Sequence, residues 1–266
     1  MKQITKKIFI SSTVNELEYE RNYLKNAIQN IKNDYVNFEA CLCDYTKTFN
    51  LTEQNMSNDD PINICLQKVE ECDYYLLMIK REYKYKRKLH CSVTELEYNK
   101  AKELHKPIIV FIFNNVTPQR YAKAFIERVR NEKWSFFINH VNDIENELSN
   151  LLNNFDSSKF ISENPKEGIY FKKHANITKT WIIKNSGNKV WENRYMKEIM
   201  GGDIFKPNAT KISIPKTLPN EEFVFIVEYS CLSDGDYYSL WKMFDSNDKP
   251  CFPNEYIGLW VNAYIR

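Results

Sequence analysis

Glycine is absent from the first 167 residues of this 266-residue chain, because all six glycines lie at or after Gly168. A P-loop and a dinucleotide-binding fingerprint both need glycine, so that the backbone can approach the phosphates closely. We therefore do not expect a kinase, a GTPase or a Rossmann dehydrogenase. Six of the nine prolines also lie at or after Pro165, which indicates that the chain changes character near this point.

Long apolar runs and a large excess of charge are also missing. A membrane-spanning helix needs about 18 or more apolar residues, and the apolar core of the start of the chain is far too short for a signal peptide. We therefore expect a cytoplasmic protein that does not bind membranes. The segment up to Lys166 holds 24 basic and 23 acidic residues, and the rest holds 13 and 12. Such balance does not favour nucleic acid as a partner.

The seven cysteines show no C-x-x-C spacing, and the four histidines are isolated from one another. Zinc sites usually bring cysteine and histidine together at short, regular spacings. We expect no metal site and no resident cofactor. The cysteines are interpreted as reduced thiols that mostly pack in the core: Cys41, Cys43, Cys65, Cys72, Cys91, Cys231 and Cys251.

Short apolar runs alternate with helical patterns in the N-terminal part, which is typical of a parallel sheet with helices on both faces. We expect four or five strands, a domain over residues 1–155 and a polar linker over 156–166. The located strands are Ile8–Ser12, a run near Tyr35, Tyr74–Ile79 and Ile108–Phe113. The expected helices are 14–31, 58–72, 93–105, 117–132 and 141–154.

Residues 167–266 contain several short alternating strands separated by Gly, Pro, Asn and Asp, which predicts an all-β sandwich. Four of the five tryptophans lie here. Trp181 and Trp241 are flanked by alternating apolar residues and are expected in the core. Trp191 precedes a polar segment, so we expect it to be partly exposed and consider it as a partner-binding residue, although core packing is the alternative.

Ligands of open α/β sheets bind beyond the carboxyl ends of the strands. Three groups of polar residues are expected there. A basic run, Lys80 to Lys88, has six basic residues in nine and either holds a phosphate or is a solvated loop. The candidate ligand-binding residues are Ser11, Ser12 and Thr13, then Arg81 and Lys84, and finally Ser92 and Thr94 beside Glu97.

Glu97 has two competing interpretations. In the first, Ser92 or Thr94 caps a helix and Glu95 or Glu97 reaches back to a free backbone N–H, as in a capping box. In the second, Glu97 is a catalytic carboxylate held over a pocket. Thr13 and Glu16 have the spacing of a second capping box.

Three segments resemble a widespread bacterial domain of unknown function, which also occurs at the N-terminus of large animal signalling ATPases. They are KIFISSTVNELEYERNYL, CDYYLLMI and SVTELEYNKAKELHKPIIVF, within about residues 6–115. That domain is similar to nucleoside 2-deoxyribosyltransferases and to Toll/interleukin-1 receptor (TIR) domains. The resemblance implies a flavodoxin-like or TIR-like fold. The residues that match the deoxyribosyltransferase pattern are Thr94, Glu97, Ala101, Lys106 and Pro107.

In the deoxyribosyltransferases the glutamate that matches Glu97 is the nucleophile. In NAD-cleaving TIR domains a glutamate on the equivalent helix is catalytic. The resemblance therefore implies a catalytic role for Glu97. Two departures weaken the match. Lys80 and Lys84 stand in a segment where the family usually has glycines. No acidic residue near Ser11 supplies a second catalytic group unless one folds inward from Asp44, Asp59, Asp60 or Asp73.

The C-terminal part resembles the four-tryptophan, immunoglobulin-like domain of selective-autophagy cargo receptors, whose members recognise protein or peptide partners. The resemblance covers the whole domain. It rests on Trp181, the Asn185-Ser186-Gly187 turn, Trp191, the Leu218-Pro219 turn, Gly235, Ser239, Trp241 and Trp260.

Two functional hypotheses follow. The first is an effector that cleaves the N-glycosidic bond of a nucleotide or nucleoside, with NAD as one candidate substrate, Glu97 as the catalytic group and a protein partner on the sandwich. By family analogy it would act in defence against phage and could assemble as a homo-oligomer. The second is a non-catalytic adaptor in which both domains bind proteins and Glu97 only caps a helix.

Overall fold

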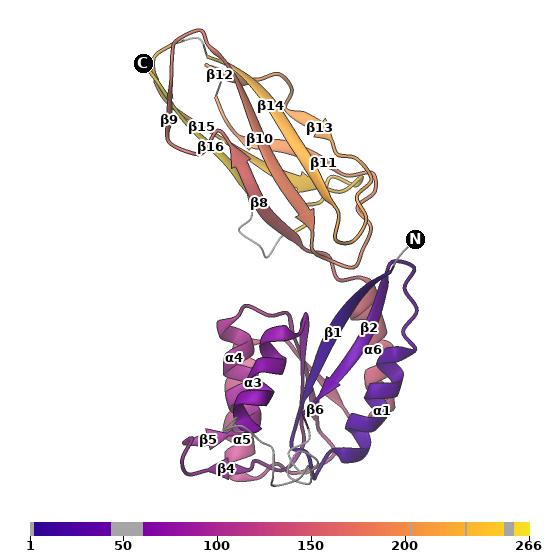
Figure 1. The fold of residues 1–266 in the computed structure, drawn as a ribbon. Coiled ribbons are helices and arrows are strands. Elements are labelled where there is room, and N and C mark those ends of the chain that lie inside the picture. The colour runs from indigo at the N-terminus through magenta and orange to yellow at the C-terminus, as the bar shows by residue number, and fades with distance from the viewer. Residues whose placement is uncertain (1–2, 44–60, 203, 232, 253–257) are drawn as a thin grey trace, which may run out of the picture. The chain divides into compact units, whose positions relative to one another are not determined.

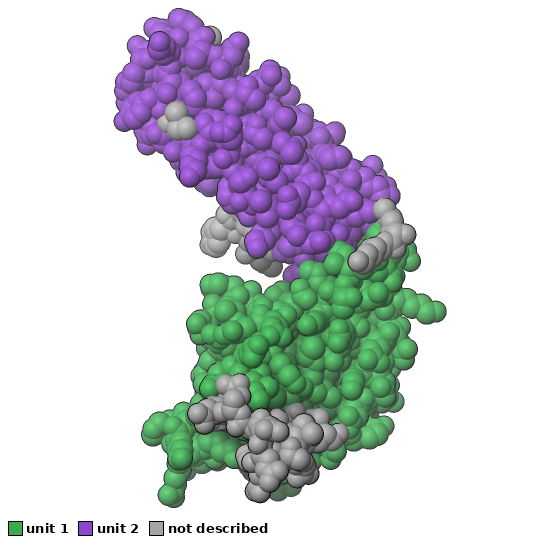
Figure 2. Space-filling view, viewed as in Figure 1, with its two compact units in different colours: residues 1–151 green, residues 152–266 purple. Residues whose placement is uncertain are grey.

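The computed structural model describes residues 3–43, 61–202, 204–231, 233–252 and 258–266 (Figure 1). The chain divides into two compact units, residues 1–151 and residues 152–266 (Figure 2).

The first unit is built on a five-stranded parallel sheet with the order β2-β1-β3-β6-β7. This confirms the expected parallel sheet, and the order is that of flavodoxin-like folds. The central strand β3 is buried along its whole length, as its continuous apolar sequence predicted. The edge strand β7 was not located from the sequence. The strands are β1 (Ile4–Ser11), β2 (Val36–Leu42), β3 (Tyr74–Ile79), β6 (Ile108–Phe113) and β7 (Ser135–Ile138).

Helices cover both faces of this sheet. On one face lie α1 and α6, and on the other lie α3, α4 and α5 (Figure 1). Helix α5 shows why these segments fold as they do, since its buried residues Ala122, Phe125, Ile126 and Val129 recur at helical spacing and form one apolar stripe. The helices are α1 (Glu18–Gln29), α3 (Pro61–Glu71), α4 (Val93–Glu103), α5 (Arg120–Glu132) and α6 (Asn142–Asn153).

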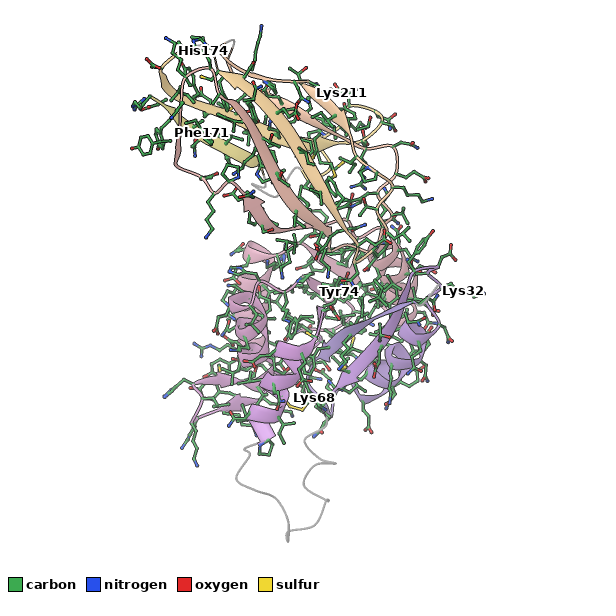
Figure 3. The ribbon with its side chains drawn as sticks, turned by 45° about the horizontal axis from the view of Figure 1, so that its top comes forward. Lys32, Lys68, Tyr74, Phe171, His174 and Lys211 are labelled. Carbon is green, nitrogen blue, oxygen red and sulfur yellow. A yellow bond between two sulfur atoms is a disulfide. The ribbon has the colours of Figure 1, made fainter. Side chains whose placement is uncertain are left out.

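A disulfide joins Cys43, which directly follows β2, to Cys65 on α3. Lys68, one turn further along α3, donates to the carbonyl of Leu42 at 2.9 Å (Figure 3). The expectation of seven reduced thiols is therefore wrong for two of them. Their spacing of 22 residues carried no signal, because the contact depends on how α3 packs beside the end of β2. The free cysteines of the described residues are Cys41, Cys72, Cys91, Cys231 and Cys251.

The second unit is a sandwich of two sheets, with the orders β12-β14-β10-β8 and β13-β11-β15-β16-β9. Strand β14 alternates exposed and buried residues over its full length, so its apolar side faces the core between the sheets. This confirms the predicted immunoglobulin-like sandwich. Its strands are β8 (Ser158–Asn164), β9 (Ile169–Phe171), β10 (Asn176–Asn185), β11 (Tyr195–Met200), β12 (Phe205–Pro207), β13 (Lys211–Ser213), β14 (Glu222–Cys231), β15 (Gly235–Phe244) and β16 (Leu259–Ile265).

The segment 156–166, expected to be a linker, belongs to the sandwich instead. Its strand β8 pairs with β10, and Ser158 is buried. Asp156 forms a bidentate ion pair with Arg194, with contacts of 2.7 and 3.1 Å. The polar composition that suggested a linker is equally typical of an edge strand, whose outer side faces water.

Three tryptophans form the centre of the sandwich. Trp181 and Trp241 are buried, as expected. Trp191 is also fully buried, so the expectation that it is partly exposed is wrong. Its indole N–H donates to Asp156 Oδ1 at 2.9 Å, and the guanidinium of Arg194 lies 5.5 Å from its ring centre. The polar segment after Trp191 misled the sequence argument, because Arg194 within it folds back over the indole.

Candidate functional site

The candidate site lies at the carboxyl ends of β1 and β3, which are neighbours in the sheet. From β1 the chain continues to β2 on one side, and from β3 it continues to β6 on the other. The two connections therefore diverge at this edge and leave a crevice, which is where open α/β sheets bind ligands. Ser11 ends β1, and Lys80 directly follows β3.

Glu97 is buried at this edge, with only 4% of its surface exposed. Its Oε2 accepts a hydrogen bond of 2.5 Å from the hydroxyl of Ser11, so α4 contacts β1 through a carboxylate. Tyr75 on β3 lies beside the pair. Burial, and then the charge of Glu97, raise the pKa of the Tyr75 phenol well above its usual value. Tyr75 therefore stays neutral, and Glu97 occupies a buried polar cluster on the inner side of α4.

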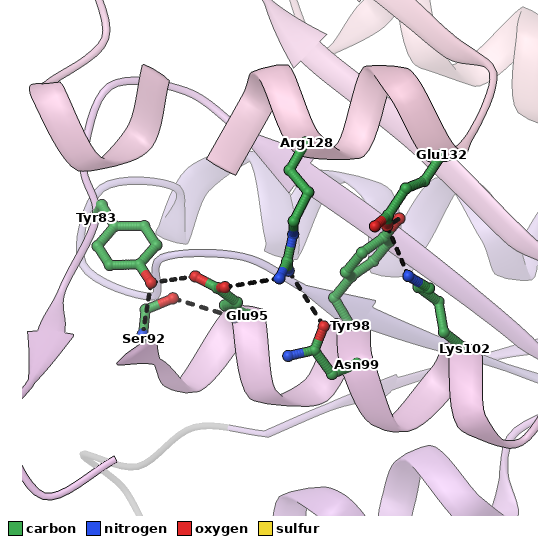
Figure 4. Close-up of polar contacts among 8 residues, drawn as sticks. All are labelled: Tyr83, Ser92, Glu95, Tyr98, Asn99, Lys102, Arg128 and Glu132. Atoms are coloured by element: carbon green, nitrogen blue, oxygen red, sulfur yellow. Dashed lines mark hydrogen bonds and ion pairs between the residues drawn. The ribbon is translucent and has the colours of Figure 1, made fainter. Parts of the chain in front are cut away.

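The start of α4 is capped by a different pair (Figure 4). Ser92 Oγ accepts from the N–H of Glu95 at 3.1 Å, which confirms Ser92 as the cap. The Glu95 carboxylate does not complete a capping box, since it accepts from the phenol of Tyr83 and pairs with Arg128 at 3.0 Å. Tyr83 in turn accepts the N–H of Ser92 at 3.0 Å. Burial and the hydrogen bond to Glu95 raise the pKa of Tyr83 to about 12. The capping interpretation is therefore wrong for Glu97.

Further along α4, polar contacts fix this helix against α5 (Figure 4). Arg128 donates to Asn99 at 3.1 Å, while Tyr98 and Lys102 both contact Glu132 at 2.8 Å. Burial opposes ionisation of Glu132, but the hydrogen bonds from Lys102 and Tyr98 outweigh it and lower the pKa of this carboxyl. This network holds α4, and with it Glu97, in a defined position.

A pocket of about 670 Å³ opens at the same edge. Five of the predicted residues line it: Ser12, Thr13, Lys84, Ser92 and Thr94. The short hairpin of β4 (Tyr85–Lys86) and β5 (Cys91–Ser92) contributes much of the wall, including further basic side chains of the Lys80 to Lys88 run. Ser11, Arg81 and Glu97 do not line the pocket. The structure thus gathers hydroxyl and basic groups around one cavity and leaves Glu97 behind its wall.

Three of the predicted residues have contacts that the sequence did not indicate. The backbone N–H of Arg81 donates to Glu16 at 3.0 Å, and Glu16 also accepts from the N–H of Glu82 at 2.9 Å. Thr13 donates to the carbonyl of Glu82 at 3.3 Å. The capping box of Thr13 and Glu16 is therefore wrong, because both side chains fasten the loop after β3. Lys84 pairs with Glu82 at 2.6 Å.

Asp73 is the one candidate for a second acidic group that lies among the described residues. Asp73 lies at the amino end of β3, where it accepts from the N–H of Lys7 and pairs with Lys6. It therefore sits at the opposite edge of the sheet from the pocket. The other three candidates, Asp44, Asp59 and Asp60, lie outside the described residues.

Arg21 is a site residue that the sequence argument missed. It is 3% exposed and donates to the carbonyls of Ile10 and Cys43 and to the hydroxyl of Ser12. A signal was present, since Arg21 shares the helical spacing of the buried residues Leu24 and Ile28. An arginine on the apolar side of a helix needs polar partners inside the fold.

The model for the domain of unknown function DUF4062 matches residues 7–163, more than half of the chain. The chain belongs to the DUF4062 family. A second model, the Ig-like domain from next to BRCA1 gene, matches residues 164–263, which cover the sandwich from the end of β8 into β16. Comparison with curated protein sequences gives no match.

Among solved structures, the CMP N-glycosidase BcmB of Clostridium botulinum is 14% identical, with a TM-score of 0.37 over 55% of this chain and 100% of that one. A CARDB domain from Pyrococcus furiosus is also 14% identical, with a TM-score of 0.31 over 42% and 95%. Native α2-macroglobulin of Escherichia coli is 10% identical, with a TM-score of 0.30 over 41% of this chain and only 6% of that one. These scores are too low to carry an argument about activity.

Within the described ranges of this DUF4062 chain, no three His, Cys, Asp or Glu side chains converge in a way that could hold a metal ion. The same ranges contain no helix with the length and apolar character needed to cross a membrane. The chemistry available at the site is that of a buried carboxylate, a hydroxyl bonded to it, and a neighbouring cavity with hydroxyl and basic groups.

Proposed function

We propose that the α/β unit binds a nucleotide or nucleoside in this pocket and cleaves its N-glycosidic bond, with Glu97 as the catalytic carboxylate. The observation that carries the proposal is the buried Ser11–Glu97 pair at the edge where the connections that follow β1 and β3 diverge. NAD is one candidate substrate. The likeness to TIR domains and deoxyribosyltransferases, and a role in defence against phage, belong to this proposal and rest on the sequence motifs alone.

The reaction suits a carboxylate. When the N-glycosidic bond breaks, its electron pair leaves with the base, and the sugar develops oxocarbenium character at the anomeric carbon. A carboxylate on one face of the sugar stabilises this charge or forms an ester with that carbon. Water then adds to the anomeric carbon, which breaks the ester bond where one has formed and regenerates the carboxylate. The free sugar leaves, and the proton lost by the water passes to the departed base. The hydroxyl of Ser11 would orient the Glu97 carboxylate by a charge-assisted hydrogen bond.

The position of Glu97 sets a condition on binding. Val93 lines the pocket, and Glu97 lies four residues later on the same side of α4. The carboxylate is therefore about one helical turn, roughly 5.4 Å, further along the helix than the pocket wall. To contact Glu97, a sugar must pass Val93 and turn the Ser11 hydroxyl aside. A phosphate on the sugar would then lie toward Lys84 and the other basic residues of the hairpin.

The burial of Glu97 also favours a second candidate, a binding module without catalysis. With 4% of its surface exposed and a hydrogen bond to Ser11, Glu97 would then serve to fasten α4 to β1. The pocket would bind a ligand whose only effect is on the interactions of the chain. The two candidates differ in whether Glu97 is needed for turnover or only for stability.

Product analysis tests the choice. Wild type, Glu97→Gln and Glu103→Gln are incubated with NAD, nucleosides and deoxynucleotides over a range of protein concentrations that permits assembly. Glu103 is a matched control because it lies on the same helix and its side chain is 69% exposed. We expect wild type and the control to release free base, and Glu97→Gln to be at least about 100-fold slower. Turnover by Glu97→Gln at the wild-type rate would exclude a catalytic role, and no turnover by stable wild type would favour the binding module.

For the second unit we propose a protein partner. The outer face of the sheet that contains β15, β16 and β9 carries exposed aromatic side chains. Tyr170, Tyr238 and Trp260 are 69%, 50% and 39% exposed. The ring of Tyr170 lies 5.3 Å from that of Tyr264. Aromatic residues are enriched at the centres of protein interfaces and supply much of their binding energy.

A pair of double variants tests this surface in the full chain. Tyr238→Ala with Trp260→Ala removes two aromatic side chains from the proposed face. Val224→Ser with Ile226→Ser alters two exposed apolar side chains of β14, in the other sheet. We expect a partner identified by crosslinking to be lost only with the first pair. Loss with the second pair alone would place the interface on the other sheet.

A further inference from the structure

We infer that Arg21 and Ser12 form an anion-recognition pair in the pocket. In this pair Arg21 positions Ser12, and the hydroxyl of Ser12 donates a hydrogen bond to a phosphate oxygen of the ligand. The nature of the ligand rests on the proposed function, whereas the pair itself rests on the contacts of two side chains.

Among the described residues, Arg21 contacts three oxygen atoms near the site. Its Nη1 lies 3.3 Å from the carbonyl of Ile10 and 3.1 Å from the hydroxyl of Ser12, and its Nη2 lies 3.0 Å from the carbonyl of Cys43. These acceptors belong to the carboxyl ends of β1 and β2 and to the residues that directly follow them. Because Arg21 is 3% exposed and its guanidinium is rigid, it holds these groups in one arrangement.

The contact with Arg21 settles how Ser12 uses its hydroxyl. A hydroxyl has one proton to donate and two lone pairs to accept with. The oxygen of Ser12 accepts from Arg21, so its own proton remains for another acceptor. Ser12 has no such acceptor among the described residues, and it lines the pocket. The neighbouring Ser11 differs, since its hydroxyl already donates a hydrogen bond to Glu97.

Two features favour a phosphate oxygen as the acceptor. The guanidinium polarises the Ser12 hydroxyl, which strengthens it as a donor to a negatively charged oxygen. Exposed basic residues of the hairpin line the same pocket and add positive charge around it: Lys84, Lys86, Arg87 and Lys88. Lysine and arginine have only donors to offer, and both bind phosphate well. A nucleotide would therefore be favoured over the corresponding nucleoside.

A cysteine at position 12 tests the pair without any ligand. The thiol of Ser12→Cys would lie beside the guanidinium of Arg21, and a neighbouring cation lowers the pKa of a thiol from about 8.5. Thr13→Cys is the matched control, because Thr13 lines the same pocket but bonds to Glu82 and not to Arg21. The alkylation rate with iodoacetamide is measured against pH, with peptide mapping to separate each new thiol from the native cysteines. We expect the lower pKa at position 12.

Substitutions of Arg21 separate its effect on the pKa of the thiol at position 12 from the effect of the basic hairpin. In Ser12→Cys with Arg21→Gln the thiol pKa should rise toward that of the control, and in Ser12→Cys with Arg21→Lys it should stay low. Should the Arg21→Gln protein fail to fold, the comparison of positions 12 and 13 in the wild-type background still decides. Equal pKa values at the two positions would overturn the pair.

Affinity completes the test, using AMP, adenosine and inorganic phosphate as probes. We expect Ser12→Ala to weaken AMP binding about tenfold, the size typical of a hydrogen bond to a charged group, and to leave adenosine binding nearly unchanged. Wild type that binds AMP no better than adenosine would overturn the phosphate assignment. A low thiol pKa and a preference for AMP, without release of base by wild type, would leave the pair standing and refute the glycosidase proposal.

Discussion

Asp156→Ala should destabilise the sandwich strongly, although Asp156 lies in a segment whose composition resembles a linker. Its carboxylate holds the Arg194 guanidinium at 2.7 and 3.1 Å and accepts the indole N–H of Trp191 at 2.9 Å. Arg194 is 5% exposed, so removal of Asp156 leaves its charge buried. Breaking a buried pair in this way typically costs about 3–5 kcal/mol. We expect about 3 kcal/mol, because the Asp156 side chain is 20% exposed and water can replace part of the contact.

The magnitude can be read from urea unfolding of the full chain. Four of the five tryptophans lie in the sandwich, and Trp134 in the other unit is already 82% exposed, so fluorescence reports chiefly the second unit. With an m-value of about 1.5 kcal/mol/M, a loss of 3 kcal/mol lowers the midpoint by about 2 M. Asp156→Asn keeps an acceptor for Trp191 and should cost less, about 1–2 kcal/mol.

The matched control is Glu192→Ala. Glu192 pairs with Lys216 at 3.1 Å, but both side chains are 55% exposed, and such surface pairs contribute little. Its midpoint should stay at the wild-type value. A midpoint for Asp156→Ala within about 0.3 M of wild type, at the same m-value, would refute the reasoning and return residues 156–166 to the role of a linker.

Three further predictions concern single groups. Cys65→Ser should lower the free energy of unfolding by about 3 kcal/mol, since the disulfide closes a loop of 22 residues, and urea unfolding should show no such loss for Cys91→Ser. Ser92→Ala should cost about 1 kcal/mol by removing the cap of α4, measured in the same way. Burial raises the pKa of Glu198 above its usual value, against the hydrogen bond from Ser239. The folded state therefore holds this proton more tightly, and its contribution to stability is present at low pH and is lost as the pH rises through the raised pKa. Glu198→Gln should flatten the pH dependence of the melting temperature in this range, and an unchanged profile would contradict the assignment.

The sheet and the sandwich could be predicted because their signals are local. Continuous apolar runs such as Tyr74–Ile79 are typical of strands buried on both faces, and their alternation with helical patterns indicated parallel order. The edge strand β7 was missed because it is four residues long and only partly buried. Strand β8 was missed because an exposed edge strand and a polar linker share the same composition.

The location of the site could be predicted from the sequence, but the contacts between its residues could not. The rule for open sheets placed Ser12, Thr13, Lys84, Ser92 and Thr94 around one cavity. Contacts between elements were beyond the reach of spacing. The two capping boxes failed for this reason, because an acidic residue three positions after a hydroxyl residue has the same spacing whether it bonds to its own helix or to a distant loop.

Strand geometry explains why two adjacent serines at this edge have different partners. Successive side chains along a strand point to opposite faces of the sheet. Phe9 packs in the cluster shared with α3, α4 and α5, so Ser11, two residues later, reaches α4 and bonds to Glu97. Ser12 is the first residue after β1; it continues this alternation, falls on the other side and bonds to Arg21 of α1. A ligand at this edge would therefore lie near the carboxylate of Glu97, which α4 supplies on one face of the sheet. It would also lie near the guanidinium of Arg21, which α1 supplies on the other face. If a phosphate takes the side of Ser12, the sugar attached to it is directed toward Ser11 and α4. It must then still pass Val93 to contact Glu97, as the proposed cleavage of the glycosidic bond requires.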